Sequence, residues 1–365
     1  MSAERILVTG ADGYIGKLIC DRLLANTNAQ LVLWVRSNDA DEFDRKRALL
    51  EQKYAAQWER IELHTGNLYA EAPFATVNPQ TLDRIIHAAA VTAFNVKEDV
   101  ANAVNRDGTR KLLVFARGCT QLRRFCYVST AYAAGLAAGA VIEQPLPPTG
   151  PFANHYERSK CEAEAILLSE YGDLPWHIYR VATVISHNDA GDVSQYNVFH
   201  NTMRLLFYGL ISMLPGTEET PIYLVTGEWV ADAIAELSVK AVPERQFFHV
   251  CHRQEESLPI GRLVDLCFEV FGNDEAFRKR RILRPLFTDF ESFELLAEGL
   301  SGLSGQVVSQ AVESIRPFAP QMFVTKQFHN DQLRNALDRY RAPDPETLVR
   351  NTVRYLVQTK WGREV

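Results

Sequence analysis

The stretch Ile6–Gly16, which reads ILVTGADGYIG, decides the fold of this chain. Its first residues are apolar and predict a short buried strand, and the amphipathic run KLICDRLLA directly after it predicts a helix. Between the two, Gly10, Gly13 and Gly16 allow a tight turn and the close approach of a pyrophosphate. The first N–H groups of the helix and the positive end of its dipole attract such an anion. The stretch therefore predicts a dinucleotide site, although an ordinary strand-to-helix turn would also account for its GxxGxxG spacing.

The bulk composition is that of a globular α/β protein. The chain has 365 residues, 47% of them apolar, which predicts two domains or one large domain with a cap. A net charge of −6 argues against a nucleic-acid partner, which would require a basic surface. The longest apolar run, LLFYGLISMLPG from Leu205, is too short to span a bilayer, and we expect it to line a pocket or pack as a helix.

Cysteine and histidine residues are scattered along the chain. The six cysteines and nine histidines show no metal-ligand spacing, so we expect no metal site. Reduced, buried thiols and the absence of a signal-peptide pattern predict a cytoplasmic protein. We expect a monomer or a homodimer with no transmembrane segment.

Apolar runs that predict buried strands alternate with helical segments through the first half of the chain. Such alternation predicts a parallel, doubly wound Rossmann-type sheet, in which ligands bind at the carboxyl ends of the strands. The strands expected after the first lie at 31–35, 61–68, 85–91, 123–130 and 178–186. We expect residues 1–186, joined by 221–251, to form this core, and 187–220 with 252–365 to form a smaller, mostly helical substrate-binding region.

A cation follows the second expected strand. NAD-specific Rossmann units carry an acidic residue at about this place, which binds the ribose 2′-hydroxyl. Here the position holds Arg36, and Arg45, Lys46 and Arg47 follow on the next expected helix. Because a cation fits a 2′-phosphate, we expect NADPH (NADP+) rather than NADH. The alternative interpretation is that Arg36 is a solvated surface charge.

A Tyr-x-x-x-Lys pair begins the helix expected from residue 155. Tyr156 and Lys160 are four residues apart and share one helical face. A nearby ammonium stabilises phenolate, so we expect Lys160 to lower the pKa of Tyr156 and let it exchange a proton with a carbonyl or alcohol. Lys160 can also hold the nicotinamide ribose. The hydroxyl of Thr130 or Ser129, at the end of the fifth strand, would orient the substrate oxygen.

These motifs carry a family resemblance. The segments TGADGYIG, HAAA, NRDGT, YVSTAY and YERSK resemble the extended short-chain dehydrogenase/reductases. More narrowly, HAAAVTAFN, VSTAY and YERSKCEAE resemble the acyl-thioester reductase branch, which holds fatty acyl-CoA reductases and the terminal reductase domains of carboxylic acid reductases and nonribosomal peptide synthetases. The resemblance covers roughly residues 4–240 and implies a catalytic set of Thr130, Tyr156 and Lys160, with Ser129 the less favoured hydroxyl.

The chain departs from the pattern at Asn67, where the family usually has Asp, and at Val181, where it commonly has Pro after the arginine. Asn67 can still meet the adenine through its amide, and the alanines after the fourth strand allow the cofactor to pass close by. The residues expected to contact the cofactor are Thr9, Gly10, Gly13, Tyr14, Ile15, Gly16, Arg36, Asn67, Leu68, Ala88, Ala89, Ala90, Asn105, Ser129, Tyr156, Lys160, Val181 and Thr183.

Three functions are compatible with the sequence. The leading hypothesis is NADPH-dependent reduction of an acyl thioester, carried by coenzyme A or by a separate acyl-carrier protein, to an aldehyde or onward to an alcohol. The second is an extended reductase or epimerase acting on a sugar nucleotide, sterol or other ketone or alcohol, and the third is a non-catalytic NADP sensor. The Phe- and Leu-rich segment 287–328 is either a greasy acyl-binding cap or a small helical core packed on the sheet.

Overall fold

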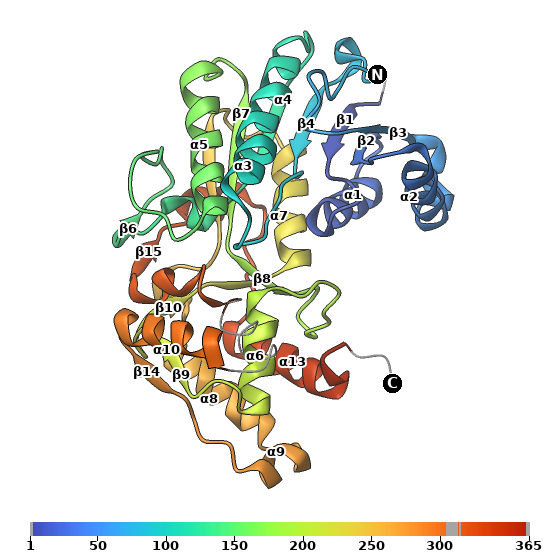
Figure 1. Ribbon diagram of the computed structural model, residues 1–365. Helices are drawn as coiled ribbons and strands as arrows, with labels where there is room; N and C mark the ends of the chain where they lie inside the picture. Colours follow the sequence, from blue (N-terminus) through green and yellow to red (C-terminus); the bar gives the residue numbers. More distant parts are fainter. Residues whose placement is uncertain (1–2, 304–312, 314, 363–365) are drawn as a thin grey trace.

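A seven-stranded parallel sheet forms the upper half of the molecule in the computed structural model, which describes residues 3–303, 313 and 315–362 (Figure 1). Its strand order is β12-β7-β5-β4-β1-β2-β3, and all neighbours are parallel. The expected doubly wound, Rossmann-type sheet is therefore confirmed. The strands are β1 (Arg5–Thr9), β2 (Gln30–Arg36), β3 (Ile61–Gly66), β4 (Arg84–His87), β5 (Arg124–Thr130), β7 (Trp176–Val181) and β12 (Gln246–Val250).

Helices cover both faces of this sheet because its strands are apolar on both sides. On β1, Ile6 and Val8 face one hydrophobic cluster and Leu7 faces another, as the two-residue period of a strand requires. The first cluster includes side chains of α1 (Tyr14–Asn26), α2 (Ala40–Lys53) and α7 (Gly227–Val239). The second includes side chains of α4 (Gly108–Arg117) and α5 (His155–Glu170), and α3 (Glu98–Ala101) with the π-helix η3 (Asn102–Asp107) leads into α4.

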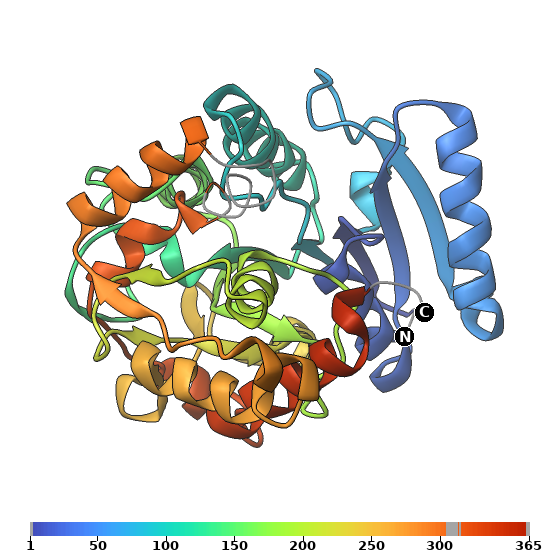
Figure 2. The same ribbon diagram turned by 60° about the horizontal axis from the view of Figure 1, so that its bottom comes forward.

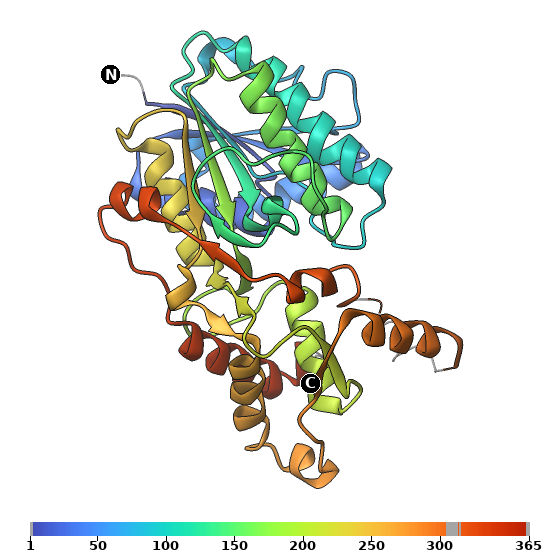
Figure 3. The same cartoon turned by 90° about the vertical axis from the view of Figure 1, so that its left-hand side faces the viewer.

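A second, mostly helical region lies below the carboxyl end of the sheet (Figures 1 and 3). It has its own hydrophobic cluster, and helices α8 and α13 pack side by side within it (Figure 2). Its helices are α6 (Val198–Tyr208), α8 (Ile260–Phe271), α9 (Glu275–Arg280), α10 (Phe290–Leu303) and α13 (Pro345–Gln358). In the described ranges of the chain, no helix combines the length and apolar character that crossing a membrane requires.

Short strands and turns complete the chain. The remaining strands are β6 (Gly139–Val141), β8 (Thr183–Ser186), β9 (Met213–Pro215), β10 (Pro221–Ile222), β11 (Leu224–Thr226), β13 (Leu258–Pro259), β14 (Leu286–Thr288) and β15 (Lys326–Phe328). The remaining helical pieces are η1 (Ala55–Arg60), η2 (Pro79–Thr81), η4 (Ala131–Ala134), η5 (Gln254–Glu256), η6 (Ala319–Phe323), α12 (Asp331–Ala336) and η7 (Lys360–Gly362).

The expectation of one strand over 178–186 is wrong. The chain leaves the large sheet after β7, and β8 pairs instead with β11. The change occurs because the amide of Ala182 still donates to Val250 beside the sheet, whereas the next amide, of Thr183, donates to Tyr223. The apolar run from Leu205 is likewise divided: its first residues end α6, Gly209 takes a left-handed conformation with φ of 68°, and β9 follows.

The segment after residue 258 is less purely helical than expected, since β13, β14 and β15 each pair with a distant strand. Part of it also returns to the sheet: β15 pairs with β6, and Phe328 and Leu333 join the hydrophobic cluster of α1 and α7. The division of the chain at 186, 221–251 and 252–365 stays a prediction. All six cysteines are buried and unpaired, as expected.

Candidate active site

A cavity of about 680 Å³ opens at the carboxyl ends of β1, β4 and β5, where the strand order of the sheet reverses. Most of the residues expected to bind the cofactor or to act in catalysis meet there. Those that line it are Gly10, Gly13, Tyr14, Ile15, Gly16, Ala88, Ala90, Ser129, Thr130, Tyr156, Lys160, Val181 and Thr183. Thr9, Arg36, Asn67, Leu68, Ala89 and Asn105 are not part of this lining.

The glycine turn leaves a cradle that side chains would fill. Gly10 has φ of +69°, and a Cβ there would meet the backbone of Ala89 at 2.8 Å. A Cβ on Gly16 would meet the carbonyl oxygen of Gly10 at 2.0 Å. Gly13, the N-cap of α1, offers no side chain to the first N–H groups of the helix. The turn therefore fits a dinucleotide, whose pyrophosphate requires close backbone and free N–H donors.

Thr9 and Ala89 lie behind the turn and fix it to β4. The Thr9 hydroxyl lies 2.7 Å from Nδ1 of His87, whose Nε2 lies 3.0 Å from the hydroxyl of Thr109. Burial lowers the pKa of His87 to about 3, so the ring is neutral at physiological pH. The amide of Ala89 donates to the Thr9 hydroxyl at 3.4 Å. These residues shape the pocket without lining it.

Asn105 does not line the cavity but supports the loop beside it. It is 1% exposed and lies in the π-helix η3, a rare helix form that is frequent at functional sites. Its side chain accepts from the amide of Val91 at 2.9 Å and donates to the Val91 carbonyl and to the hydroxyl of Ser159, both at 3.0 Å. Asn105 thus ties the loop that follows β4 to helix α5.

Thr130, Tyr156 and Lys160 come together as expected. Thr130 ends β5 and its hydroxyl accepts from the amide of Tyr132 at 3.2 Å, which caps the turn η4. Helix α5 begins at His155 because the side chain of Asn154 accepts from the amide of Glu157 at 3.0 Å. This start places Tyr156 in the first turn of the helix, where it lines the same cavity as Thr130 and Lys160.

Burial is the largest cause of the pKa shifts of both Tyr156 and Lys160. Burial raises the pKa of Tyr156 to about 12, and the nearby Thr130 side chain opposes that rise. Burial also lowers the pKa of Lys160 to about 7. The Lys160 ammonium donates to the Val128 carbonyl at 2.7 Å and lies 4.0 Å from the ring centre of Tyr127. Desolvation therefore acts on this pair more strongly than their mutual charge does.

Ser129 lines the same cavity, but its hydroxyl is engaged elsewhere. It donates to the buried carboxylate of Glu164 at 2.5 Å. A hydroxyl has one proton to donate, so Ser129 cannot give the same proton to a substrate oxygen. The Thr130 hydroxyl also donates, to the Val181 carbonyl, but at 3.4 Å this hydrogen bond is much longer than that of Ser129. The difference favours Thr130 as the hydroxyl that can turn to a substrate.

Residues expected at the adenosine end lie beyond the lining of the cavity. Arg36 ends β2 and is exposed, and among the described residues its guanidinium makes no hydrogen bond or ion pair. Lys46 is instead neutralised by Asp12 at 2.8 Å and by Glu42 at 3.2 Å. Asn67 accepts from the amide of Tyr69 at 3.1 Å and so caps the turn after β3.

Leu68 is buried in the hydrophobic cluster beneath α4, where its side chain lies against Gly108. The structure therefore places it in the core, next to the turn of Asn67.

An aromatic cluster that the sequence did not predict lies beside Tyr156. Phe94 lies 5.9 Å from Tyr156 between ring centres and stacks on Phe318 at 5.2 Å. Tyr132 meets Phe318 edge-on at 5.1 Å. Phe94 and Tyr132 lie in the segments HAAAVTAFN and YVSTAY, which carry the family resemblance, whereas no local pattern connects Phe318 to the site.

The Phe- and Leu-rich segment 287–328 divides between the two interpretations. Phe293 and Ile315 are buried in the hydrophobic cluster of the lower region, as a helical core requires. Phe318 instead stacks on Phe94, which lies next to Tyr156. Residues 304–312 and 314 of this segment lie outside the described part of the chain. Within the described part, no group of three or more His, Cys, Asp or Glu side chains is arranged to hold a metal ion.

A parallel nucleotide-binding sheet whose glycine turn meets a Tyr-x-x-x-Lys helix defines an oxidoreductase of the extended short-chain dehydrogenase/reductase class. The sequence model of the male sterility protein family (NAD_binding_4) matches residues 8–234, well over half of the chain. The chain belongs to this family. The resemblance to the thioester reductase branch is confirmed by this match together with the relatives described next.

The chain is similar to part of several characterised proteins. It is 26% identical to glycine betaine reductase ATRR of Emericella nidulans over 68% of this chain and 21% of that protein. It is 28% identical to chloroplastic fatty acyl-CoA reductase 2 of Arabidopsis thaliana over 40% of this chain and 27% of that protein. The matched region therefore spans only about a fifth to a quarter of these relatives.

Solved structures share the fold at lower identity. The terminal R domain from the myxalamid PKS-NRPS biosynthetic pathway is 20% identical, with a TM-score of 0.77 over 99% of this chain and 92% of that one. UDP-glucuronic acid 4-epimerase from Bacillus cereus, solved with NAD, is 16% identical, with a TM-score of 0.67 over 97% of this chain and 99% of that one. At these identities the likeness concerns the fold alone.

Proposed function

We propose that this protein is an NADPH-dependent reductase that converts an acyl thioester to an aldehyde, which the same site can reduce again to an alcohol. The observation that carries the proposal is the meeting of Thr130, Tyr156 and Lys160 with the glycine turn in one cavity. The curated relatives named as fatty acyl-CoA reductases and the solved terminal R domain support a thioester substrate.

The role of each side chain follows from the proton or hydrogen bond that it can donate. When bound, the nicotinamide supplies the hydride. Thr130 and Tyr156 both line the cavity, where their hydroxyl groups would bind the thioester carbonyl oxygen and stabilise its negative charge. Tyr156 would then donate its proton to that oxygen, or to the departing thiolate, and Lys160 would bind the ribose hydroxyls. Departure of the thiol would leave the aldehyde.

The aromatic cluster supports an apolar acyl group. Phe94 and Tyr132 line the cavity, and Phe318 packs behind them against both rings. These rings would cover the acyl chain next to its carbonyl and keep water away from the reacting carbon. The thiol part, as coenzyme A or a carrier protein, would extend out of the cavity. A cytoplasmic monomer or homodimer would suit either substrate.

Arg36 supports NADPH as the reductant. It ends β2, the strand next to β1 in the sheet, and its guanidinium has no other partner among the described residues. A 2′-phosphate is the ligand that a free guanidinium in this place fits, by paired charge-assisted hydrogen bonds.

The test is a comparison of substrates with the purified protein. NADPH oxidation and aldehyde release would be measured with acyl-CoA, with an acyl-carrier protein, and with a panel of ketones and nucleotide sugars. Turnover of a thioester is expected. Turnover of ketones or nucleotide sugars alone would support the second hypothesis, and cofactor binding without any turnover would support a sensor.

A further inference from the structure

A chain of buried polar groups begins at Ser129 on the wall of the cavity and leads away from it. The Ser129 hydroxyl donates to Oε1 of Glu164 at 2.5 Å, and Nη2 of Arg180 donates to Oε2 of the same carboxylate at 2.7 Å. Nη1 of Arg180 lies 3.1 Å from Nε2 of His249. All four residues are at most 3% exposed, and the chemistry proposed above uses none of them.

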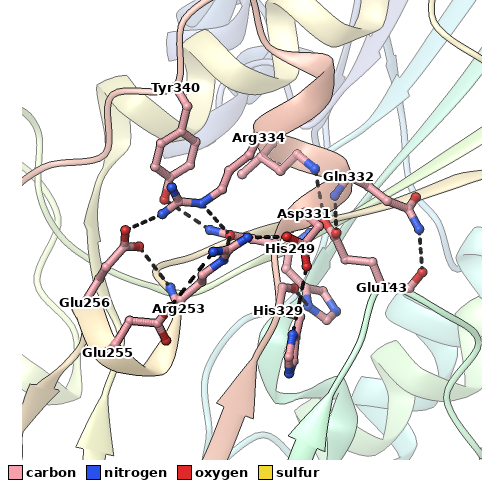
Figure 4. Close-up of polar contacts among 12 residues, drawn as sticks. Glu143, His249, Arg253, Glu255, Glu256, His329, Asp331, Gln332, Arg334 and Tyr340 are labelled. Atoms are coloured by element: carbon pink, nitrogen blue, oxygen red, sulfur yellow. Dashed lines mark hydrogen bonds and ion pairs between the residues drawn. The ribbon is translucent and has the colours of Figure 1, made fainter.

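The outer end of this chain is fixed by a polar cluster, shown in Figure 4. Nδ1 of His249 donates to the backbone carbonyl of His329 at 2.7 Å, and its amide donates to Glu143 at 2.9 Å. Glu143 also accepts from the amide of Gln332 at 2.6 Å (Figure 4). Burial and the adjacent Arg180 lower the pKa of His249 to about 3, so its Nε2 is a fixed acceptor for Arg180.

The inner end lies next to the catalytic lysine. Glu164 follows Lys160 by four residues on α5 and shares its helical face. Ser129 and Arg180 are directly paired across β5 and β7, so the chain is built into the register of the sheet. Lys160 also donates to the Val128 carbonyl at 2.7 Å and lies near the ring of Tyr127 and the neutral His87, none of which carries a net negative charge. Glu164 is the group that raises the pKa of Lys160 against the effect of burial.

We propose that Glu164 is a positioning residue: held by Arg180, its carboxylate turns the Ser129 hydroxyl away from the substrate and stabilises the ammonium of Lys160 one turn earlier on α5. This inference rests on the proposed function only for its effect on turnover. It assigns Thr130 and Tyr156 as the two hydroxyls that meet the carbonyl. It also gives Lys160 a nearby negative charge that opposes the lowering of its pKa by burial.

The test compares Glu164→Gln with Glu162→Gln. Glu162 stands on the same helix, where its carboxylate is partly exposed and pairs with Arg106 at 3.4 Å, so it controls for loss of charge alone. NADPH affinity and kcat would be measured from about pH 5 to 10, a range that covers the lowered pKa of Lys160 and a further fall of one unit. For Glu164→Gln we expect the alkaline fall in both quantities to move down by about one pH unit or more. For Glu162→Gln we expect the profile of the unaltered protein.

Two further variants separate positioning from folding. Glu164→Asp keeps the negative charge, so the alkaline fall in NADPH affinity and kcat is expected at the pH of the unaltered protein. Because the shorter side chain holds Ser129 less well, kcat itself is expected to stay below that of the unaltered protein. Ser129→Ala removes one hydrogen bond to Glu164 and is expected to leave the pH of the alkaline fall unchanged. The proposal is overturned if Glu164→Gln folds, as judged by circular dichroism, and its alkaline fall stays at the pH of the unaltered protein. It is also overturned if Glu164→Asp moves the alkaline fall as far as Glu164→Gln does. Because the affinity profile needs no acyl substrate, it tests Glu164 even if no thioester is reduced.

Discussion

At the scale of single residues, burial sets the protonation of the catalytic pair. Tyr156 has a pKa raised to about 12 and Lys160 one lowered to about 7, both chiefly by desolvation. A neutral tyrosine is the form that can give a proton, so the raised pKa suits the reductive direction. The lysine needs a compensating charge, which Glu164 provides.

The Tyr156 hydroxyl is expected to be required for turnover. Tyr156→Phe keeps the ring that lies 5.9 Å from Phe94 but removes the proton donor. Because general acid catalysis contributes about 10²–10⁴-fold, kcat should fall by that factor with little change in NADPH affinity. Steady-state kinetics would measure this, with Tyr208→Phe, a partly exposed tyrosine, as the control. A variant that kept most of its kcat would contradict the role of Tyr156.

Arg36 is expected to distinguish the two nicotinamide cofactors. Arg36→Ala should weaken NADPH binding by about tenfold or more, because a charge-assisted hydrogen bond contributes about 1.5–3 kcal/mol. NADH lacks the 2′-phosphate, so its affinity should not change, and it serves as the internal control. Fluorescence titration of both cofactors would measure the effect. Equal weakening of both would show that Arg36 contacts a part that they share.

The meeting of the three proposed catalytic residues in one cavity could be predicted because their relation is local. Tyr156 and Lys160 are one helical turn apart, and Thr130 marks the end of an apolar strand. Phe318 could not be predicted, since only tertiary folding brings it onto Phe94. The raised pKa of Tyr156 could not be predicted from the sequence either, because burial depends on how many distant side chains cover the ring.

At the scale of elements, the glycine turn is the part with least room for change. In Gly16→Ala the new Cβ would lie 2.0 Å from the Gly10 carbonyl, so the turn must shift, at a cost of about 1–3 kcal/mol. Cofactor affinity should fall with it, as measured by titration. Gly299→Ala is the matched control: it lies in α10 with open space around it, and should stabilise the protein by about 0.5–1 kcal/mol. Normal affinity in Gly16→Ala would show that the turn does not hold the cofactor.

Elements with strong apolar patterns were predicted, and those set by distant pairing were not. The strands of the large sheet carry near-continuous apolar runs, so their positions follow from the sequence. The split of 178–186 into β7 and β8 depends on β11, a separate segment of the chain. The π-helix η3 has no sequence signal, because it arises where Asn105 reaches back to the loop after β4.

At the scale of the whole molecule, a buried carboxylate joins the sheet region to the C-terminal segment. Glu157 on α5 accepts from Gln321 at 2.8 Å, and Gln321 in turn accepts from Lys326 at 2.5 Å. Burial raises the pKa of Glu157 from 4.5 to about 7. Its contribution to the free energy of unfolding is therefore fully present below pH 4.5 and is lost as the pH rises through 7.

Glu157→Gln is expected to remove this pH dependence. The difference in unfolding free energy between the unaltered protein and the variant should fall between about pH 5 and 8, by roughly 3 kcal/mol at most. Urea unfolding at several pH values would measure it. Glu162→Gln, on the same helix but partly exposed, should show no such change. A constant difference across this range would mean that Glu157 is not protonated on burial.

The overall class of the molecule followed from the sequence, but its internal connections did not. Alternating strands and helices predict the Rossmann-type sheet, and a weaker pattern after residue 258 predicts a helical region. The return of β15 to β6 carries no local signal, since a three-residue strand is too short to show a period.

The six buried cysteines can report where the protein unfolds first, because each becomes reactive only when its surroundings open. Burial raises the pKa of each thiol, so an alkylating reagent should find almost no reactive thiolate in the native state. Cys267 lies in the hydrophobic cluster of the lower region, whereas Cys20 in α1 and Cys126 in β5 belong to the cluster that joins the sheet to α1 and α7. Pulsed alkylation at rising urea, read by peptide mass, would therefore report the order in which the two halves open. Bound cofactor should delay labelling at Cys20 and Cys126 more than at Cys267.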